Sequence, residues 1–203
     1  MRIHIFGASG SGVTTLGKAL SEQLNIEYFD SDDFFWLKTE VPFTEKQNPE
    51  IRNTTVSDIL HTTDSWIFGG SIIHWGENIF PPFDLVIFLY LPPEIRMERL
   101  RKREFERYGE EITVNPERAV KSEEFLEWAK DYDHDTGIAN RTLNAHREWL
   151  TGIDVPLLEI SGDYPVSDKI KVILDRIKRD NLRLNGKPTF NVDPAQARKK
   201  KQQ

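Results

Sequence analysis

The chain has 203 residues, of which 38% are hydrophobic and 30% charged, and its formal net charge is −6. This length and composition favour one α/β domain with a sizeable core and long exposed helices. The absence of cysteine excludes disulfide bonds, thiol catalysis and thiolate metal sites. No apolar run approaches the roughly 20 residues of a membrane span, and the first residues show a strand pattern and not a secretion signal. We therefore expect a cytoplasmic protein without a membrane partner.

The charge is distributed unevenly along the chain. From Gly186 onward, five lysines and arginines accompany a single aspartate, which leaves 22 basic and 32 acidic residues before that point. Because the segment 181–203 also lacks an apolar pattern, we expect a basic, disordered tail after one domain at 1–180. An acidic domain does not suit nucleic-acid binding, so RNA contact through the tail is kept only as an alternative.

Small residues dominate the segment after the first expected strand, which covers residues 2–6. This segment matches the phosphate-binding pattern G-x-x-x-x-G-K-[ST] except at one position, where Val13 replaces the lysine. A helix is expected at 14–24, because leucines recur there every four residues. Glycines let backbone N–H groups point at phosphate oxygens, and the helix N-terminus adds partial positive charge. We therefore expect nucleotide phosphates to be bound by the whole loop, which comprises Gly7, Ala8, Ser9, Gly10, Ser11, Gly12, Val13, Thr14 and Thr15.

The cation that replaces the missing lysine is not evident from the loop itself. Lys18 follows Thr14 by one turn and its side chain leans toward the helix N-terminus. It lies about 140° around the helix from position 13, however. Arginines from a later segment are the better candidates.

Acidic residues follow the second expected strand, at residues 26–29. Asp30, Asp32 and Asp33 stand directly after it. Carboxylates at this place can hold a hydrated Mg²⁺ or accept the proton of an acceptor hydroxyl, as phosphoryl transfer requires. Thr14 of the loop is a further candidate ligand for Mg²⁺. The competing interpretation is helix capping, which we expect for Asp33 ahead of the residues at 34–36.

A pair of glycines, Gly69 and Gly70, follows the third expected strand at 66–68. A helix is expected before that strand, at 49–61. Glycines here permit either a close approach of the backbone to a ligand or a tight turn. Both interpretations stand at this point.

A basic helix is expected at 93–108, after an apolar strand at 84–91. Much of its charge fits i,i+4 pairing on a solvated face. The helix nevertheless leads into a charged insertion at about 109–139, which has the position of a lid and contains an expected helix at 116–130. Arginines beside a lid can clamp a transferring phosphoryl group, and our candidates are Arg103, Arg107 and Arg141.

The insertion ends in a stretch that contains Asp131, Asp133, His134 and Asp135, residue types that bind metals. Because they lie in one flexible charged segment, we favour a role at the lid edge or plain solvation. A helix at 138–150, a strand at 155–160 and a helix at 166–179 are expected to complete the domain.

Strands and helices alternate throughout, which predicts a doubly wound parallel sheet. Ligands in such sheets bind beyond the carboxyl ends of the strands. The glycine loop, the aspartates and the glycine pair all follow strands, so the sequence predicts that they meet at one edge.

These residues resemble those of the small P-loop kinases related to adenylate, shikimate and gluconate kinase. Phe29-Asp30-Ser31-Asp32 is similar to the shikimate kinase D-x-D, and Ile67-Phe68-Gly69-Gly70 to the glycine pair of that family. The Gly-Ala-Ser-Gly-x-Gly-x-Thr-Thr loop looks most like bacterial adenylate-kinase-related proteins of the topology-modulation group. The resemblance implies a P-loop NTPase three-layer sandwich with a five-stranded parallel sheet, helices on both faces and a lid insertion. The segment after Gly70 lacks a shikimate-type arginine signature, which argues against shikimate itself.

The resemblance implies ATP-dependent transfer of a phosphoryl group to a nucleotide or a small hydroxyl-bearing acceptor. ATP would bind the loop, Mg²⁺ would bind Thr14 and Asp30, and Asp32 would position the acceptor. Arg103, Arg107 and Arg141 would close over the γ-phosphate. Since Val13 replaces the lysine, the alternative is a nucleotide-binding switch or weak ATPase that acts through a protein partner.

Overall fold

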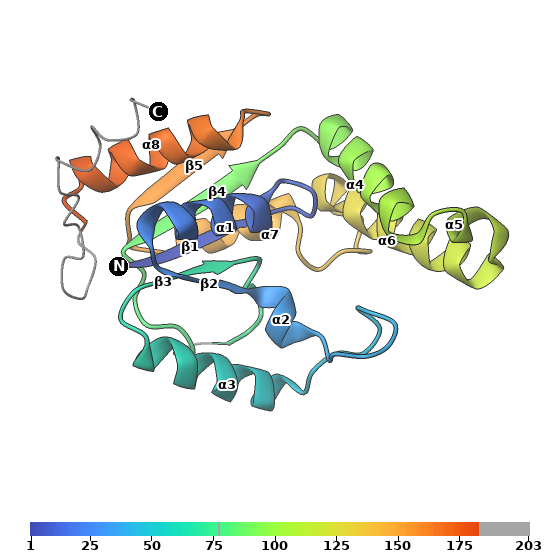
Figure 1. Cartoon of the computed structure of the whole chain (residues 1–203), viewed down its shortest axis with the longest axis horizontal. Coiled ribbons are helices and arrows are strands. Elements are labelled where there is room, and N and C mark those ends of the chain that lie inside the picture. The colour runs from blue at the N-terminus through green and yellow to red at the C-terminus, as the bar shows by residue number, and fades with distance from the viewer. Residues whose placement is uncertain (77, 183–203) are drawn as a thin grey trace, which may run out of the picture.

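The computed structural model describes residues 1–76 and 78–182. Its centre is a five-stranded, entirely parallel sheet with the strand order β2-β3-β1-β4-β5 (Figure 1). The strands are β1 (Arg2–Gly7), β2 (Glu27–Asp30), β3 (Trp66–Gly69), β4 (Leu85–Tyr90) and β5 (Leu157–Ser161). The predicted doubly wound parallel sheet is therefore confirmed. The predicted tail lies outside the described residues beyond position 182.

Helices cover both faces of the sheet, because alternate residues of each strand point to opposite sides. Ile3 and Ile5 belong to an apolar cluster with helices α1 (Val13–Leu24) and α8 (Val166–Arg179). Phe6 points the other way and packs with helix α7 (Leu143–Thr151). Helix α3 (Pro49–Thr62) covers β3 on that same face. The three-layer arrangement predicted from the sequence is confirmed.

Three helices extend beyond the end of the sheet (Figure 1): α4 (Pro93–Tyr108), α5 (Glu111–Val114) and α6 (Pro116–His134). Helix α6 packs on α4 through an apolar cluster that includes Leu100 and Ala129. The helix expected at 116–130 continues to His134. No helix in the described part of the chain is long and apolar enough to cross a membrane.

The helix expected at 138–150 begins later, at Leu143. The Thr142 side chain accepts a hydrogen bond from the backbone N–H of Ala145 at 3.2 Å and caps it. Ahead of it, the Asp131 carboxylate accepts backbone hydrogen bonds from Ile138 at 2.9 Å and Ala139 at 2.8 Å. The Ala139 bond is the main reason that the pKa of Asp131 falls to about 2. Asp131 therefore holds the edge of the insertion as a structural group, since its lone pairs are used by the turn.

Helix α2 (Ser31–Phe35) directly follows β2. Asp30 caps it, because its side chain accepts a hydrogen bond from the backbone N–H of Asp32 at 3.1 Å. The expectation that Asp33 is the cap was wrong. The strand continues to Asp30, so the helix begins at Ser31, three residues before the helix that Asp33 would cap.

Candidate active site

The glycine loop connects β1 to α1 and borders a cavity of about 1030 Å³. Gly12 has a φ of 94° and no side chain caps the N-terminus of α1, so the first backbone N–H groups of that helix keep their hydrogen-bonding capacity. An uncapped helix N-terminus beside a glycine loop suits phosphate oxygens. Every residue of the predicted loop lines the cavity except Ser11, which is buried and whose hydroxyl has no partner among the described residues.

Val13 lines the cavity and also packs against the apolar cluster beneath α1. Lys18 is exposed and does not line the cavity. The possibility that Lys18 replaces the loop lysine therefore finds no support. The cations that line the cavity come from later segments.

Arg96 connects the glycine loop to the insertion through buried contacts. Its guanidinium is fully buried, donates to the carbonyl oxygen of Ser9 at 3.3 Å and to that of Ala129 at 2.9 Å, and forms an ion pair with Asp133. A Cβ at Gly10 would lie 3.0 Å from the Arg96 side chain. Glycine at this position therefore allows the loop to lie directly on α4. Because Asp133 neutralises it and it does not line the cavity, Arg96 is a structural tie and not a phosphate ligand.

Thr14 and Asp30, the predicted metal ligands, are in direct contact. The Thr14 hydroxyl donates to Oδ2 of Asp30 at 2.8 Å, and the Tyr28 hydroxyl donates to the same oxygen at 2.7 Å. Both hydroxyl hydrogens are thus directed at Asp30, which leaves the Thr14 oxygen lone pairs available. A hydroxyl and a carboxylate are hard oxygen donors of the type that Mg²⁺ prefers. Burial, and then the charge of Asp30, raise the pKa of Tyr28, so the phenol stays protonated.

Tyr28 reaches Asp30 through space left by two glycines. A Cβ at Gly17 would lie 2.2 Å from the Tyr28 ring, and a Cβ at Gly69 would lie 2.2 Å from its hydroxyl. Gly70 has a φ of 103°, and a Cβ there would meet the Ser31 hydroxyl at 1.8 Å. The glycine pair is therefore required by close packing against Tyr28 of β2 and Ser31 of α2 and by backbone conformation, although Gly70 also lines the cavity.

Replacing Gly17 by alanine is expected to destabilise the protein by about 1–3 kcal/mol, because the added methyl overpacks against Tyr28. In an ordinary helix interior the same change stabilises by up to about 1 kcal/mol. Urea unfolding followed by tryptophan fluorescence measures the difference. Gly152→Ala is the matched control, since a Cβ there meets only the Trp149 carbonyl oxygen at 3.6 Å. Unchanged or increased stability of Gly17→Ala would show that Tyr28 can move aside.

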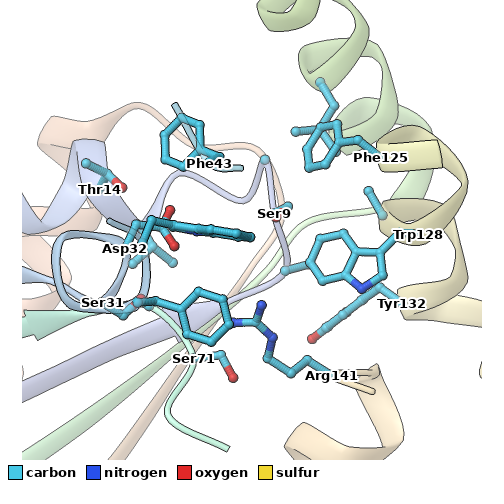
Figure 2. Close-up of a pocket in the computed structure, with 18 of the residues that line it drawn as sticks. Ser9, Thr14, Ser31, Asp32, Phe43, Ser71, Phe125, Trp128, Tyr132 and Arg141 are labelled. Atoms are coloured by element: carbon cyan, nitrogen blue, oxygen red, sulfur yellow. The ribbon is translucent and has the colours of Figure 1, made fainter. Parts of the chain in front are cut away.

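Asp32 lies beside Asp30, and its side chain faces the cavity (Figure 2). Burial raises the pKa of its carboxyl, and repulsion from Asp30 adds to the effect. Attraction to Arg141 and Arg103 opposes the rise. Asp32 thus has a higher proton affinity than an ordinary aspartate and faces two arginines, which suits a group that accepts a proton.

The three arginines predicted to contact the phosphoryl group, Arg103, Arg107 and Arg141, all line the cavity. The Arg103 guanidinium lies 5.6 Å from the ring centroid of Phe125, and that of Arg107 lies 4.9 Å from that of Phe43. Within residues 1–76 and 78–182, none of the three guanidinium groups forms an ion pair or a hydrogen bond. Three cations therefore face the cavity without a fixed anionic partner.

Arg52 is a further cavity residue that the sequence analysis missed. It is 7% exposed, its guanidinium lies 4.1 Å from the Trp75 ring centroid, and its Nε donates to Asn53 Oδ1 at 2.9 Å. Arg52 and Arg141 lie 5.8 and 5.5 Å from the ring centroid of Phe35. Burial is the main cause that lowers the pKa of both arginines, and Arg141 lowers that of Arg52 further. Neither guanidinium group forms an ion pair within the described residues, although Asp32 attracts Arg141, so the two are a candidate site for an anion.

A signal for Arg52 exists in the sequence. Arg52, Val56 and Leu60 recur every four residues, and all three are buried on the inner face of α3. An arginine in the apolar row of a helix is a candidate for a buried functional group.

A buried histidine joins two hydroxyl groups at the cavity. Nε2 of His146 lies 3.0 Å from the Ser71 hydroxyl, and its Nδ1 lies 2.8 Å from the Tyr132 hydroxyl. All three residues line the cavity. The sequence analysis missed them, because they come from three separate segments with no local pattern in common.

Comparison with known proteins supports the resemblance to the small P-loop kinases. A model of the AAA domain family matches residues 3–125. Uncharacterized protein YqaC of Bacillus subtilis is 40% identical over 173 residues, which cover 85% of this chain and 95% of YqaC. Shikimate kinase of Bacillus cereus is 33% identical over 114 residues, which cover 49% of this chain and 66% of that enzyme.

The fold has relatives among solved structures. A deoxyadenosine kinase from M. mycoides with bound dATP superimposes with a TM-score of 0.55 at 16% identity, covering 88% of this chain and all of that one. Similarity at this level of identity concerns the fold alone. Together with the parallel sheet and the glycine loop, these matches confirm the resemblance to small P-loop kinases. The chain belongs to the AAA domain family of P-loop proteins.

Proposed function

We propose that this protein is an ATP- and Mg²⁺-dependent phosphotransferase that acts on a small anionic acceptor. The observation that carries the proposal is that one cavity contains two complementary halves. The glycine loop and the Thr14–Asp30 pair form one half, and Asp32 with the arginines forms the other. A phosphate donor and an acceptor can therefore meet between them.

In the proposed reaction, the backbone N–H groups of the loop and of the α1 N-terminus bind the ATP phosphates. Thr14 and Asp30 would hold Mg²⁺, which would neutralise charge on the phosphates. Arg52 and Arg141 bind the anionic group of the acceptor, and this fixes the direction of its hydroxyl toward Asp32.

Asp32 takes the proton of the acceptor hydroxyl as that oxygen forms a bond to the γ-phosphorus. The bond between the γ-phosphorus and the bridging oxygen breaks, and ADP leaves with the electron pair. Arg103 and Arg107 on α4 are the cations that replace the missing loop lysine, since they face the cavity without a fixed partner. Charge at these positions stabilises the transferring group as a loop lysine would.

The first experiment is to measure ADP formation from Mg-ATP with a panel of nucleoside monophosphates, nucleosides and small hydroxy acids. We expect turnover with one class of anionic acceptor and little in the acceptor-free control. Equal turnover with and without acceptors would contradict the proposal and indicate an ATPase. ATP binding without ADP formation would indicate a nucleotide switch, the alternative that the valine at position 13 favours.

A further inference from the structure

The His146 network brings together three elements at one end of the cavity. Ser71 follows β3, Tyr132 lies in α6 of the insertion, and His146 lies in α7. Figure 2 shows Ser71 and Tyr132 grouped with Arg141 at that end. The network therefore lies beside the cations that form the anion site.

His146 is neutral. Its side chain is 1% exposed and packs against aromatic rings, including that of Phe6 at 4.9 Å between centroids. No carboxylate contacts it among the described residues. Of the charged groups around it, Arg141 has the largest effect on its pKa. Burial, followed by Arg141, lowers the pKa of His146 to about 3. A neutral imidazole has one N–H donor and one nitrogen acceptor.

The number of hydrogens in the network determines what it offers to a ligand. Ser71, Tyr132 and the neutral His146 together carry three polar hydrogens, whereas the two hydrogen bonds between them use only two. One O–H group is therefore always left over. It belongs to Ser71 when the ring hydrogen is on Nε2, and to Tyr132 when the ring hydrogen is on Nδ1.

The chemistry of the two hydroxyl groups favours the tautomer with hydrogen on Nε2. Tyr132 and Ser71 are buried alike, at 5% and 6% exposure, and neither hydroxyl has another partner within the described chain. A phenol is a stronger donor and a weaker acceptor than an aliphatic hydroxyl, so the Tyr132 O–H donates to Nδ1. Nε2 then carries the hydrogen and donates it to the Ser71 oxygen. The Ser71 O–H is left for the cavity.

We propose that Ser71 is a specificity-determining residue of the acceptor site, and that its hydroxyl donates to an anionic oxygen of the acceptor. His146 and Tyr132 are positioning residues that keep Ser71 a donor. This inference rests on the proposed function, because it assigns the same oxygen-bearing group to Arg52, Arg141 and Ser71. The group is a carboxylate or a phosphate, and a cationic or donor-only group at this position is rejected.

The test uses the full chain with ¹⁵N-labelled histidine, because the protein has only five histidines. Loss of one signal in His146→Gln assigns the resonance. Inorganic phosphate and acetate are then titrated separately in the presence of saturating Mg-ADP, which fills the nucleotide loop. We expect a neutral ring protonated at Nε2 at pH 7, and ¹⁵N shifts that move as either anion binds.

Ser71→Ala is expected to weaken anion binding by about tenfold or more, the usual loss when a charged group loses a hydrogen bond. Tyr132→Phe is expected to weaken it less, while moving the His146 ¹⁵N shifts toward a mixture of tautomers. Ser167→Ala, an exposed serine on α8, is the control and should change neither. Stronger binding of phosphate than of acetate would identify a phosphorylated acceptor, and the reverse a carboxylate.

An imidazolium, an Nδ1-protonated ring in the bound state, binding of neither anion, or equal affinity in Ser71→Ala would each overturn the inference. The readout does not depend on turnover. A protein that binds anions through Ser71 but transfers no phosphate would therefore contradict only the proposed function. An active kinase that is unaffected by Ser71→Ala would contradict only this inference.

Discussion

Replacing Asp32 by asparagine is expected to slow acceptor-dependent phosphoryl transfer by about 10²- to 10⁴-fold, the usual contribution of a general base. The affinity for Mg-ATP should change little, because the loop and the Thr14–Asp30 contact do not involve the Asp32 side chain. The check is to compare initial rates of ADP formation, using the acceptor that the panel identifies, with nucleotide binding. Asp33→Asn is the matched control, since Asp33 does not line the cavity. Equal turnover in Asp32→Asn and the wild type would remove Asp32 from the mechanism.

The pH dependence of the same rate gives a second view of Asp32. The pKa of its carboxyl is raised above the ordinary value of 3.8. The midpoint of the acidic limb of the pH–rate profile should therefore lie above pH 3.8. Because Arg141 lowers that pKa, removing the guanidinium in Arg141→Gln should move the acidic limb to higher pH. A limb that does not move would mean that another group titrates.

Replacing Arg96 by methionine is expected to lower the free energy of unfolding by about 3–5 kcal/mol, the cost of leaving a buried charge unpaired. Asp133 would keep a largely buried carboxylate, and the carbonyl oxygens of Ser9 and Ala129 would lose their donor. Urea unfolding followed by tryptophan fluorescence measures the loss. The double variant Arg96→Met/Asp133→Asn should recover part of it, because no buried charge remains.

Arg99→Met is the control for this prediction. Arg99 lies on the same helix and pairs with Asp163 at 2.5 Å, but both side chains are about 40% exposed, at 41% and 39%. An exposed pair contributes at most about 1 kcal/mol. If the two variants were equally stable, the buried contacts of Arg96 with the loop and the insertion would not contribute to stability.

The sequence by itself determined the elements whose signals are local. The helices expected at 93–108 and 166–179 have the observed bounds of α4 and α8. At the N-terminus, only the end of the strand and the start of the helix differ, each by one residue. Periodicity and helix-terminal residues act over a few positions, so they can be read in one dimension. The order of elements then predicted the shared edge, because parallel strands end on the same side. The contact of Thr14 with Asp30 follows from that topology.

Boundaries set by distant partners were not predictable. The start of α7 depends on Thr142 and on the carboxylate of Asp131, which lies in the preceding helix, twelve residues before Leu143. The start of α2 depends on how far β2 continues along β3, where Asp30 pairs with Gly69. Such capping choices are decided by tertiary neighbours and not by the residues around the boundary.

Only the tertiary structure sorted the charged residues of the basic helix. Arg96, Leu100 and Glu104 share its buried face, where Asp133 neutralises Arg96 and the Ser122 hydroxyl donates to Glu104 at 3.0 Å. Arg103 and Arg107 lie on the side that faces the cavity. Sequence spacing shows which residues share a helix face. It does not show which face will meet the ion-pair or hydrogen-bond partners that allow a charged residue to be buried. The same reason applies to the His146 network, whose members converge from three segments because their buried hydrogen bonds are satisfied only by residues far away in the chain.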